Sequence, residues 1–488
     1  MLGMYIHTHW GYSHPYAARS WSLEDWRGYL AALKELGYDL VMFWPLLDSM
    51  PLQPTPSDQG FLARTAKVID KAHRQFGMQF LITVCPNLVG NEYAARYPYD
   101  ARPYFVCERK INPQDPAGVA DMLAARRWQF EALQKADGLV IIDGDPGGYI
   151  GSTDADFVNL VKGQIEVFRQ FNPSGELVYW MWFGWENYNR FWAEAQQSSS
   201  DSAEPIYRVE TSTFTHALQG IRQQIPEPWS LMGAWPQHLE TTQSPELAQK
   251  RMYIPYGAIE GEPTFPLTNC SPEQVCAAFK RYPAGTFPRG VMGNAQTHCL
   301  QLPHTYMFAR CAKGGPGANL DLPGFAEGLL PGLGGEISAA WEAIASGSAQ
   351  QQKQAALSMR AAASQTLTPG RYSGLLFGDA GRFLIDLAMN LEVRASLAEL
   401  GQAVEAGQAS EYKPAVHSVL ASLRPYQQRL GFVDAYGDPM LSLLNGTLSR
   451  LGDASLDKVL RQFYDWRNPA VRNGILPRLL DAMQAYCR

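Results

Sequence analysis

The chain has 488 residues, of which 46% are hydrophobic and 18% are charged, and its formal net charge is −6 at pH 7. This length is sufficient for one large domain and a second, smaller one. The negative net charge and the lack of a dense Lys/Arg run argue against a nucleic-acid partner. No apolar run approaches the ~18 residues of a membrane-spanning helix, so no membrane partner is expected.

Apolar runs with strand character alternate with amphipathic helical stretches, which is typical of βα units and a parallel sheet. Strands are predicted at residues 4–9, 38–45, 78–87, 138–148, 176–185, 229–235, 253–261 and 289–298. Helices are predicted at residues 22–37, with Ser22 as N-cap and Gly37 as stop, at 58–77, at 113–135, after an N-cap at Thr153, and at 302–313.

Eight strand candidates, each followed by a helix candidate, predict an α/β fold with a (β/α)8 TIM barrel over residues 1–315. An open doubly wound sheet is the alternative, but no Gly-rich phosphate-binding fingerprint follows the first strand. The Gly/Pro-rich segment at 313–324 marks the boundary. Residues 316–488 carry Ala, Leu, Gln and Ser at helical spacing and predict a mainly α-helical C-terminal domain.

The N-terminus "MLGMYIHTHW" has neither a basic segment nor an apolar one. We therefore expect a cytoplasmic protein, or a secreted one whose signal peptide is not part of this sequence. The seven cysteines are odd in number and form no C-x-x-C motif. Neither a disulfide framework nor a zinc ribbon is expected.

Barrel enzymes build their active sites from residues at the carboxyl ends of the strands. The first predicted strand ends in His7 and His9, an H-x-H pattern that suits either a metal site or the floor of a sugar pocket. Trp10, His14 and Arg19 follow in the same loop.

The fourth predicted strand ends in "VIIDGDPGGY", which contains Asp143 and Asp145. Alternate strand residues face the same way, so we expect both carboxylates at the barrel mouth. Two partly buried carboxylates cannot both ionise freely, which raises one pKa and produces a general acid beside a charged partner. In the alternative, one aspartate caps the following turn and only the other is functional.

The predicted catalytic residues are Asp143, Asp145, His9, His14 and Glu186, although Glu186 could equally start a helix. Tryptophan faces bury the apolar side of a sugar, and amides and imidazoles bond its hydroxyl or acetamido groups. The predicted substrate-binding residues are His7, Trp10, Arg19, Trp44, Asn87, Tyr149, Trp182, Trp185, Trp235, His238, Asn294, Gln296 and His298. The alternative is that the tryptophans fill the core and the polar groups satisfy loops.

The H-x-H pattern resembles the opening of the amidohydrolase superfamily. That family adds Lys or His on strand four, His on strands five and six, and Asp on strand eight. Here strand four offers Asp, strand five offers Trp, and strand eight offers Asn and Gln, so only His238 fits. Because too few ligands converge, we predict no metal and no other cofactor.

The paired acids after strand four resemble the layout of barrel glycoside hydrolases of families 18, 20 and 84. A histidine near strand one with an aspartate after strand four also resembles the inverting sialidases of family 156, which pair a His acid with an Asp base. In this chain, His9 or His14 facing Asp143 or Asp145 would reproduce that pairing.

These resemblances imply an exo-acting glycoside hydrolase that cleaves a terminal acidic or N-acetylated sugar. It would be sialidase-like or N-acetylhexosaminidase-like and would use Asp/His or paired-Asp acid–base catalysis. The expected partner is a carbohydrate substrate, and the sequence is also compatible with a homodimer. The alternatives are a metal-dependent amidohydrolase-type enzyme using His7 and His9, and a sugar-binding barrel without catalysis.

Overall fold

A computed structural model describes residues 1–9, 12–103, 106–197, 209–261, 267–282, 285–431, 447–463 and 475–488. The chain forms two compact units that interleave in sequence. The barrel unit consists of Met1–His9, Gly37–Tyr256 and Arg281–Asn294, and the helical unit consists of Trp10–Leu36, Gly257–Lys280 and Ala295–Arg488. The expected boundary at residue 315 coincides with no border between them. Within the described ranges, no helix is both long and apolar enough to cross a membrane.

The barrel unit is built on a closed barrel of eight parallel strands in the order β1-β10-β9-β8-β7-β6-β3-β2. The prediction of a closed (β/α)8 barrel is therefore confirmed. The strands are β1 (Leu2–His7), β2 (Leu40–Trp44), β3 (Gln79–Val84), β6 (Gly138–Ile142), β7 (Glu176–Met181), β8 (Trp229–Gly233), β9 (Arg251–Tyr253) and β10 (Gly290–Ala295).

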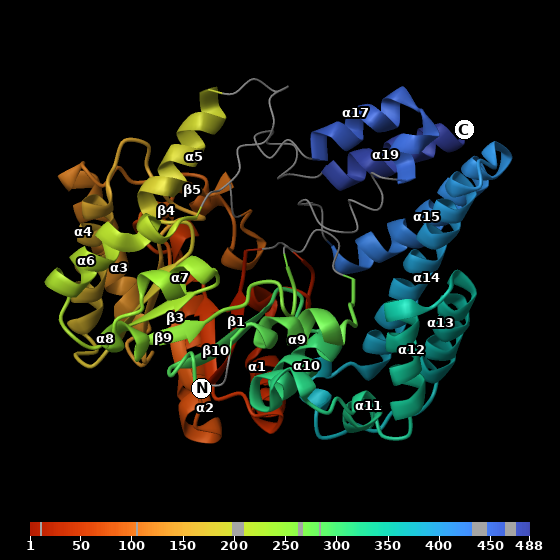
Figure 1. The fold of residues 1–488 in the computed structure, drawn as a ribbon, viewed down its shortest axis with the longest axis horizontal. Coiled ribbons are helices and arrows are strands. Elements are labelled where there is room, and N and C mark those ends of the chain that lie inside the picture. The colour runs from red at the N-terminus through yellow and green to blue at the C-terminus, as the bar shows by residue number, and fades with distance from the viewer. Residues whose placement is uncertain are drawn as a thin grey trace. The chain divides into compact units, whose positions relative to one another are not determined.

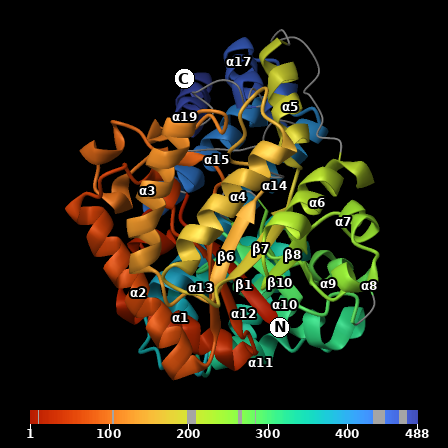
Figure 2. The same cartoon turned by 90° about the vertical axis from the view of Figure 1, so that its left-hand side faces the viewer.

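Helices of the barrel unit connect these strands, and α3 packs beside α4, which packs beside α6 (Figure 2). The predicted N-cap of α4 is present, because the Thr153 hydroxyl accepts the N–H of Asp156 while the Asp156 carboxylate accepts the N–H of Thr153. The helices are α2 (Pro56–Phe76), α3 (Pro116–Ala132), α4 (Asp154–Arg169), α5 (Trp185–Gln197), α6 (Thr215–Gln224), α7 (Pro236–Thr241) and α8 (Pro245–Ala248).

The pairing register decides which strand residues face the barrel interior. Trp180 of β7 contacts the Tyr5 ring of β1 at 5.5 Å between ring centroids. Because β1 and β7 are not neighbours in the barrel, this contact crosses the interior. Ile142 pairs with Trp180 and therefore also faces inward. The next residue, Asp143, faces the helices instead, since successive strand residues alternate between the two faces.

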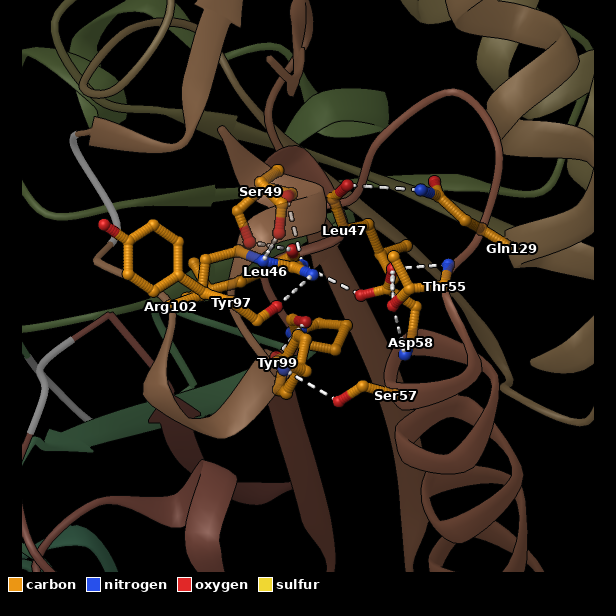
Figure 3. Close-up of polar contacts among 12 residues, drawn as sticks. Leu46, Leu47, Ser49, Thr55, Ser57, Asp58, Tyr97, Tyr99, Arg102 and Gln129 are labelled. Carbon is orange, nitrogen blue, oxygen red and sulfur yellow. Dashed lines mark hydrogen bonds and ion pairs between the residues drawn. The ribbon is translucent and has the colours of Figure 1, made fainter. Parts of the chain in front are cut away.

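A short antiparallel hairpin, β4 (Leu88–Gly90) with β5 (Glu108–Lys110), follows β3 and was not predicted. Strands of three residues are too short to show a period in the sequence. Between them, Arg102 is buried and donates to the Asp58 carboxylate at 2.8 Å and to the Ser49 carbonyl at 3.1 Å (Figure 3). Tyr99 stands on the same segment, and its hydroxyl donates to the Pro45 carbonyl.

The helical unit confirms the prediction that the C-terminal part is mainly α-helical. Helices α12 to α15 lie side by side in sequence order (Figure 1). A disulfide joins Cys276 of α9 to Cys311 of α10, a single bond that the cysteine spacing did not indicate. The helices are α1 (Leu23–Leu36), α9 (Pro272–Lys280), α10 (Leu302–Gly314), α11 (Leu322–Leu329), α12 (Gly334–Ser346), α13 (Ala349–Ala363), α14 (Ala380–Glu405), α15 (Ala409–Leu430), α17 (Ala454–Phe463) and α19 (Ile475–Cys487).

Candidate active site at the carboxyl ends of the barrel strands

His7 and His9 lie against each other at the end of β1. Their Nδ1 atoms are 2.7 Å apart, so one ring donates a hydrogen bond to the other. His7 is buried and His9 is half-buried. Because two protonated Nδ1 atoms cannot face each other at this distance, the pair shares one proton there. An imidazole held in this way is oriented for proton transfer at its other nitrogen.

The residue between the histidines anchors the end of β1. The Thr8 hydroxyl donates to the Trp44 carbonyl at 3.0 Å and lies 3.3 Å from the Tyr99 hydroxyl. The Trp44 indole N–H in turn donates to Asp48 at 2.8 Å, and the Trp44 ring meets His9 edge-on at 4.6 Å between centroids. Trp44 therefore borders the histidine pair, and its hydrogen bond to Asp48 orients its ring. The sequence offered no signal for Thr8 and Tyr99, because the contact joins distant loops.

Four aromatic side chains gather at the ends of β7, β8 and β9, and we call Trp182, Phe183, Trp235 and Tyr256 the aromatic platform. Trp182 lies at centroid distances of 5.3 Å from Trp235, 5.0 Å from Tyr256 and 5.1 Å from Phe183. The Trp235 indole N–H donates to the Trp182 carbonyl at 2.9 Å. Phe183, Trp235 and Tyr256 are half-buried, whereas Trp182 is buried. Such rings can pack against the apolar face of a sugar.

Asp143 is fully buried, with 0% exposure, and both of its oxygens already accept hydrogen bonds. Oδ1 accepts the backbone N–H groups of Trp182, Phe183 and Gly184 at 2.9, 3.0 and 3.0 Å. Oδ2 accepts the Tyr179 hydroxyl at 2.9 Å. Burial raises the pKa of Asp143 to about 7, while the hydrogen bonds from Trp182, Gly184 and Tyr179 lower it.

The expectation that Asp143 points into the barrel mouth therefore needs correction. The side chain follows the inward-facing Ile142 and lies on the helix side of the strand. Its carboxylate accepts the N–H groups of the turn that follows β7, whereas the alternative had one aspartate capping the turn after its own strand. Asp145, two residues later, is exposed, and its Oδ1 accepts the Tyr188 hydroxyl at 3.4 Å. The end of β6 thus presents one carboxylate to solvent rather than two.

Glu186 and Trp185 both belong to the start of α5. Glu186 accepts the backbone N–H of Asp154 at 2.9 Å, and Asp154 accepts the N–H of Glu186 at 3.3 Å, so each carboxylate caps the other's helix. Burial, and then the charge of Glu186, raises the pKa of Asp154 to about 6. Trp185 is fully buried, stacks on Phe157 and donates to Ser152. Trp185 therefore supports the helix layer rather than meeting a substrate, which corrects the predicted role.

Asn87 and His238 are also occupied by contacts within the fold. Asn87 is fully buried and donates to the carbonyls of Ile111 and Gly148. His238 Nδ1 accepts the backbone N–H of Trp235 at 3.0 Å, and burial lowers its pKa to about 3. His238 is therefore a neutral cap of α7, not an exposed ligand for a sugar.

Two further predicted residues differ in exposure. Tyr149 is 37% exposed, and its backbone N–H donates to the Asn189 side chain at 2.8 Å. Asn294 is fully buried near the end of β10. It shares its strand face with Met292, which lies so close to Gly3 of β1 that a Cβ there would be 2.5 Å from the Met292 sulfur. Asn294 therefore faces the barrel interior at the level of the strand ends.

The remaining predicted residues belong to the helical unit. His14 is half exposed and pairs with Asp25 at 3.0 Å, while Arg19 is buried. The Gln296 backbone N–H donates to Glu260 at 2.5 Å. His298 is buried, and its Nδ1 lies 2.6 Å from the Tyr29 hydroxyl. Trp10 lies outside the described residues.

A metal site is not formed by the parts of the chain that the structure describes, since no group of three His, Cys, Asp or Glu side chains there is placed to hold an ion. The hydrogen-bond partner of His238 is the backbone N–H of Trp235, and not a histidine of the H-x-H pair. The donor set around His7 and His9 thus does not match the amidohydrolase pattern.

No protein-family model matches the chain, and no curated protein matches it. Among solved structures, the chain is similar to a glycoside hydrolase family 138 enzyme that targets pectin rhamnogalacturonan II, with 9% identity, a TM-score of 0.49, and coverage of 96% of this chain and 69% of that one. It is also similar to a family 89 glycoside hydrolase from Clostridium perfringens, with 10% identity, a TM-score of 0.43, and coverage of 94% of this chain and 58% of that one. A third similar structure is the protein CpGH84D, with 11% identity, a TM-score of 0.41, and coverage of 92% of this chain and 75% of that one.

Proposed function

We propose that this chain is an exo-acting glycoside hydrolase that cleaves a terminal acidic or N-acetylated sugar. The observation that carries the proposal is the grouping, at the carboxyl ends of the barrel strands, of an oriented imidazole pair with the half-buried residues Phe183, Trp235 and Tyr256 of the aromatic platform. Catalytic groups of barrel enzymes come from this edge, and aromatic rings there suit a sugar.

His9 and Asp145 are the proposed proton-transfer groups. His9 is the more exposed member of the imidazole pair, and Asp145 is the carboxylate that the end of β6 presents to solvent. A histidine acid with an aspartate base would suit displacement by water in a single step, because no second carboxylate is needed as a nucleophile.

The proposal is tested with chromogenic glycosides, namely an N-acetylglucosaminide, an N-acetylgalactosaminide and a sialoside. Release of the chromophore from at least one of them is expected, and Asp145→Asn and His9→Gln should abolish most of it. Turnover that is equal in both variants and in the wild type would remove these residues from the mechanism.

A sugar-binding barrel without catalysis is the second candidate, and the saturated carboxylate of Asp143 favours it. Because Asp143 and Glu186 both accept hydrogen bonds from backbone groups, Asp145 is the one predicted catalytic acid that remains at this edge. Binding of the matching free sugars, measured by calorimetry, together with no turnover of any chromogenic glycoside, would select this candidate.

A further inference from the structure

We infer that Asp143 is a positioning residue that sets the geometry of the aromatic platform through hydrogen-bond acceptance. The inference rests on the proposed function only in assigning a sugar to the platform. The placement of the rings by Asp143 stands on contacts within the barrel unit.

The turn that follows β7 needs an acceptor in the place of Asp143. Three consecutive backbone N–H groups, of residues 182 to 184, point at the single atom Oδ1. Gly184 holds a φ of 76°, and a Cβ there would lie 2.4 Å from Thr213 Cγ2, so the turn has little room to adopt another shape. Buried N–H groups without a partner are costly, and Asp143 satisfies all three.

The same peptide groups hold the rings. Trp182 is fixed at its N–H by Asp143 and at its carbonyl by the Trp235 indole. The Trp182 ring meets Tyr256 edge-on, at an interplanar angle of 62°. A shift of the turn would therefore move Trp182 and release the hydrogen bond that orients Trp235.

The chemistry required of Asp143 is acceptance by Oδ1, not exchange of a proton with a substrate. An asparagine keeps an oxygen in the place of Oδ1, and its amide can face the Tyr179 hydroxyl, which accepts as well as donates. An alanine keeps neither. The pair Asp143→Asn and Asp143→Ala thus separates positioning from proton transfer.

Near-UV circular dichroism of the full chain provides a readout that does not depend on activity, because neighbouring indole rings contribute strongly to it. Asp143→Asn should keep the wild-type spectrum. Asp143→Ala should lose about half of the tryptophan signal with an unchanged far-UV spectrum, as should Trp235→Phe, which removes the indole donor. If Asp143→Ala does not fold, Asp143→Ser provides a shorter acceptor and should show part of the same loss.

On any chromogenic glycoside of the panel that is turned over, Asp143→Asn should keep kcat within about threefold, whereas Asp143→Ala should raise KM about tenfold. A native near-UV spectrum in both Asp143→Ala and Asp143→Ser would overturn the inference. So would an Asp143→Asn variant with a native spectrum but a loss of kcat of about 10² or more, since that marks a proton-transfer group. If no glycoside is turned over, the proposed function fails while the spectra still decide the role of Asp143.

Discussion

The ends of β1 and β6 both carry a pair of ionisable residues two positions apart, yet the two pairs differ in burial and in hydrogen-bond partners. At β1, His7 faces the barrel interior, and His9 is half-buried beside it. At β6, Asp143 is sealed under the turn that follows β7, while Asp145 is exposed. The difference shows that the exposure of a side chain at a strand end depends on what packs over it, because the turn that follows β7 covers Asp143 and leaves Asp145 exposed.

The largest expected effect tests whether the exposed members of the two pairs are the working ones. Asp145→Asn and His9→Gln should each reduce turnover by about 10²–10⁴, which is the usual cost of losing a proton-transfer group. Asp121→Asn, an exposed carboxylate on α3, is the matched control and should be silent. Wild-type rates in the Asp145 variant would show that the end of β6 takes no part in catalysis.

The second prediction concerns the buried ion pair of Arg102 and Asp58, which lies on the segment whose Tyr99 contacts Thr8. Arg102→Met leaves the buried Asp58 carboxylate without its cation and loosens the segment on which Tyr99 meets Thr8. We expect the free energy of unfolding to fall by about 3–5 kcal/mol, measured by urea denaturation. Arg96→Met, on the same segment but exposed, is the control and should cost little. A loss below about 1 kcal/mol would mean that the Arg102–Asp58 pair does not hold this segment.

A smaller effect compares the two possible replacements of Asp143. Asp143→Ala leaves three N–H groups buried without a partner and should cost about 3 kcal/mol of unfolding free energy, whereas Asp143→Asn should cost about 1 kcal/mol or less. Urea denaturation at neutral pH measures both values. Equal losses would indicate that the charge of Asp143, and not its acceptor oxygen, stabilises the turn.

The smallest effect is the pH dependence that His238 adds beside the platform. Its pKa is about 3 in the folded state and about 6.5 in the unfolded state, so the unfolded chain binds a proton first as the pH falls. The stability due to neutral His238 is therefore complete above pH 6.5 and is lost as the pH falls toward 3. His238→Asn keeps an acceptor for the Trp235 N–H and should flatten this loss, by about 2 kcal/mol at pH 5. The exposed His417→Asn is the control, and identical acid profiles for all three proteins would contradict the prediction.

The composition and periodicity of the sequence were sufficient for the architecture. Alternation of apolar strands and amphipathic helices predicted eight strands, and each observed strand overlaps its predicted range, although β9 overlaps it only at Tyr253 and β6 ends six residues earlier than predicted. Local signals such as the caps at Ser22 and Thr153 also appear in the structure. These features depend on neighbouring residues, and therefore a single sequence contains them.

The sequence alone did not determine which residues of β6 face the barrel interior. Its residues, Gly-Leu-Val-Ile-Ile, are apolar on both faces, because a strand inside a barrel is covered by side chains on one side and by helices on the other. Nothing in such a run states whether Ile142 or Asp143 faces inward. Pairing with β7 decided it, and the same tertiary contacts made Asp143 a cap, Trp185 a helix residue of the core and His238 a neutral acceptor. Each of these roles depends on a partner at least thirty positions away or on a backbone group whose direction only the closed barrel sets.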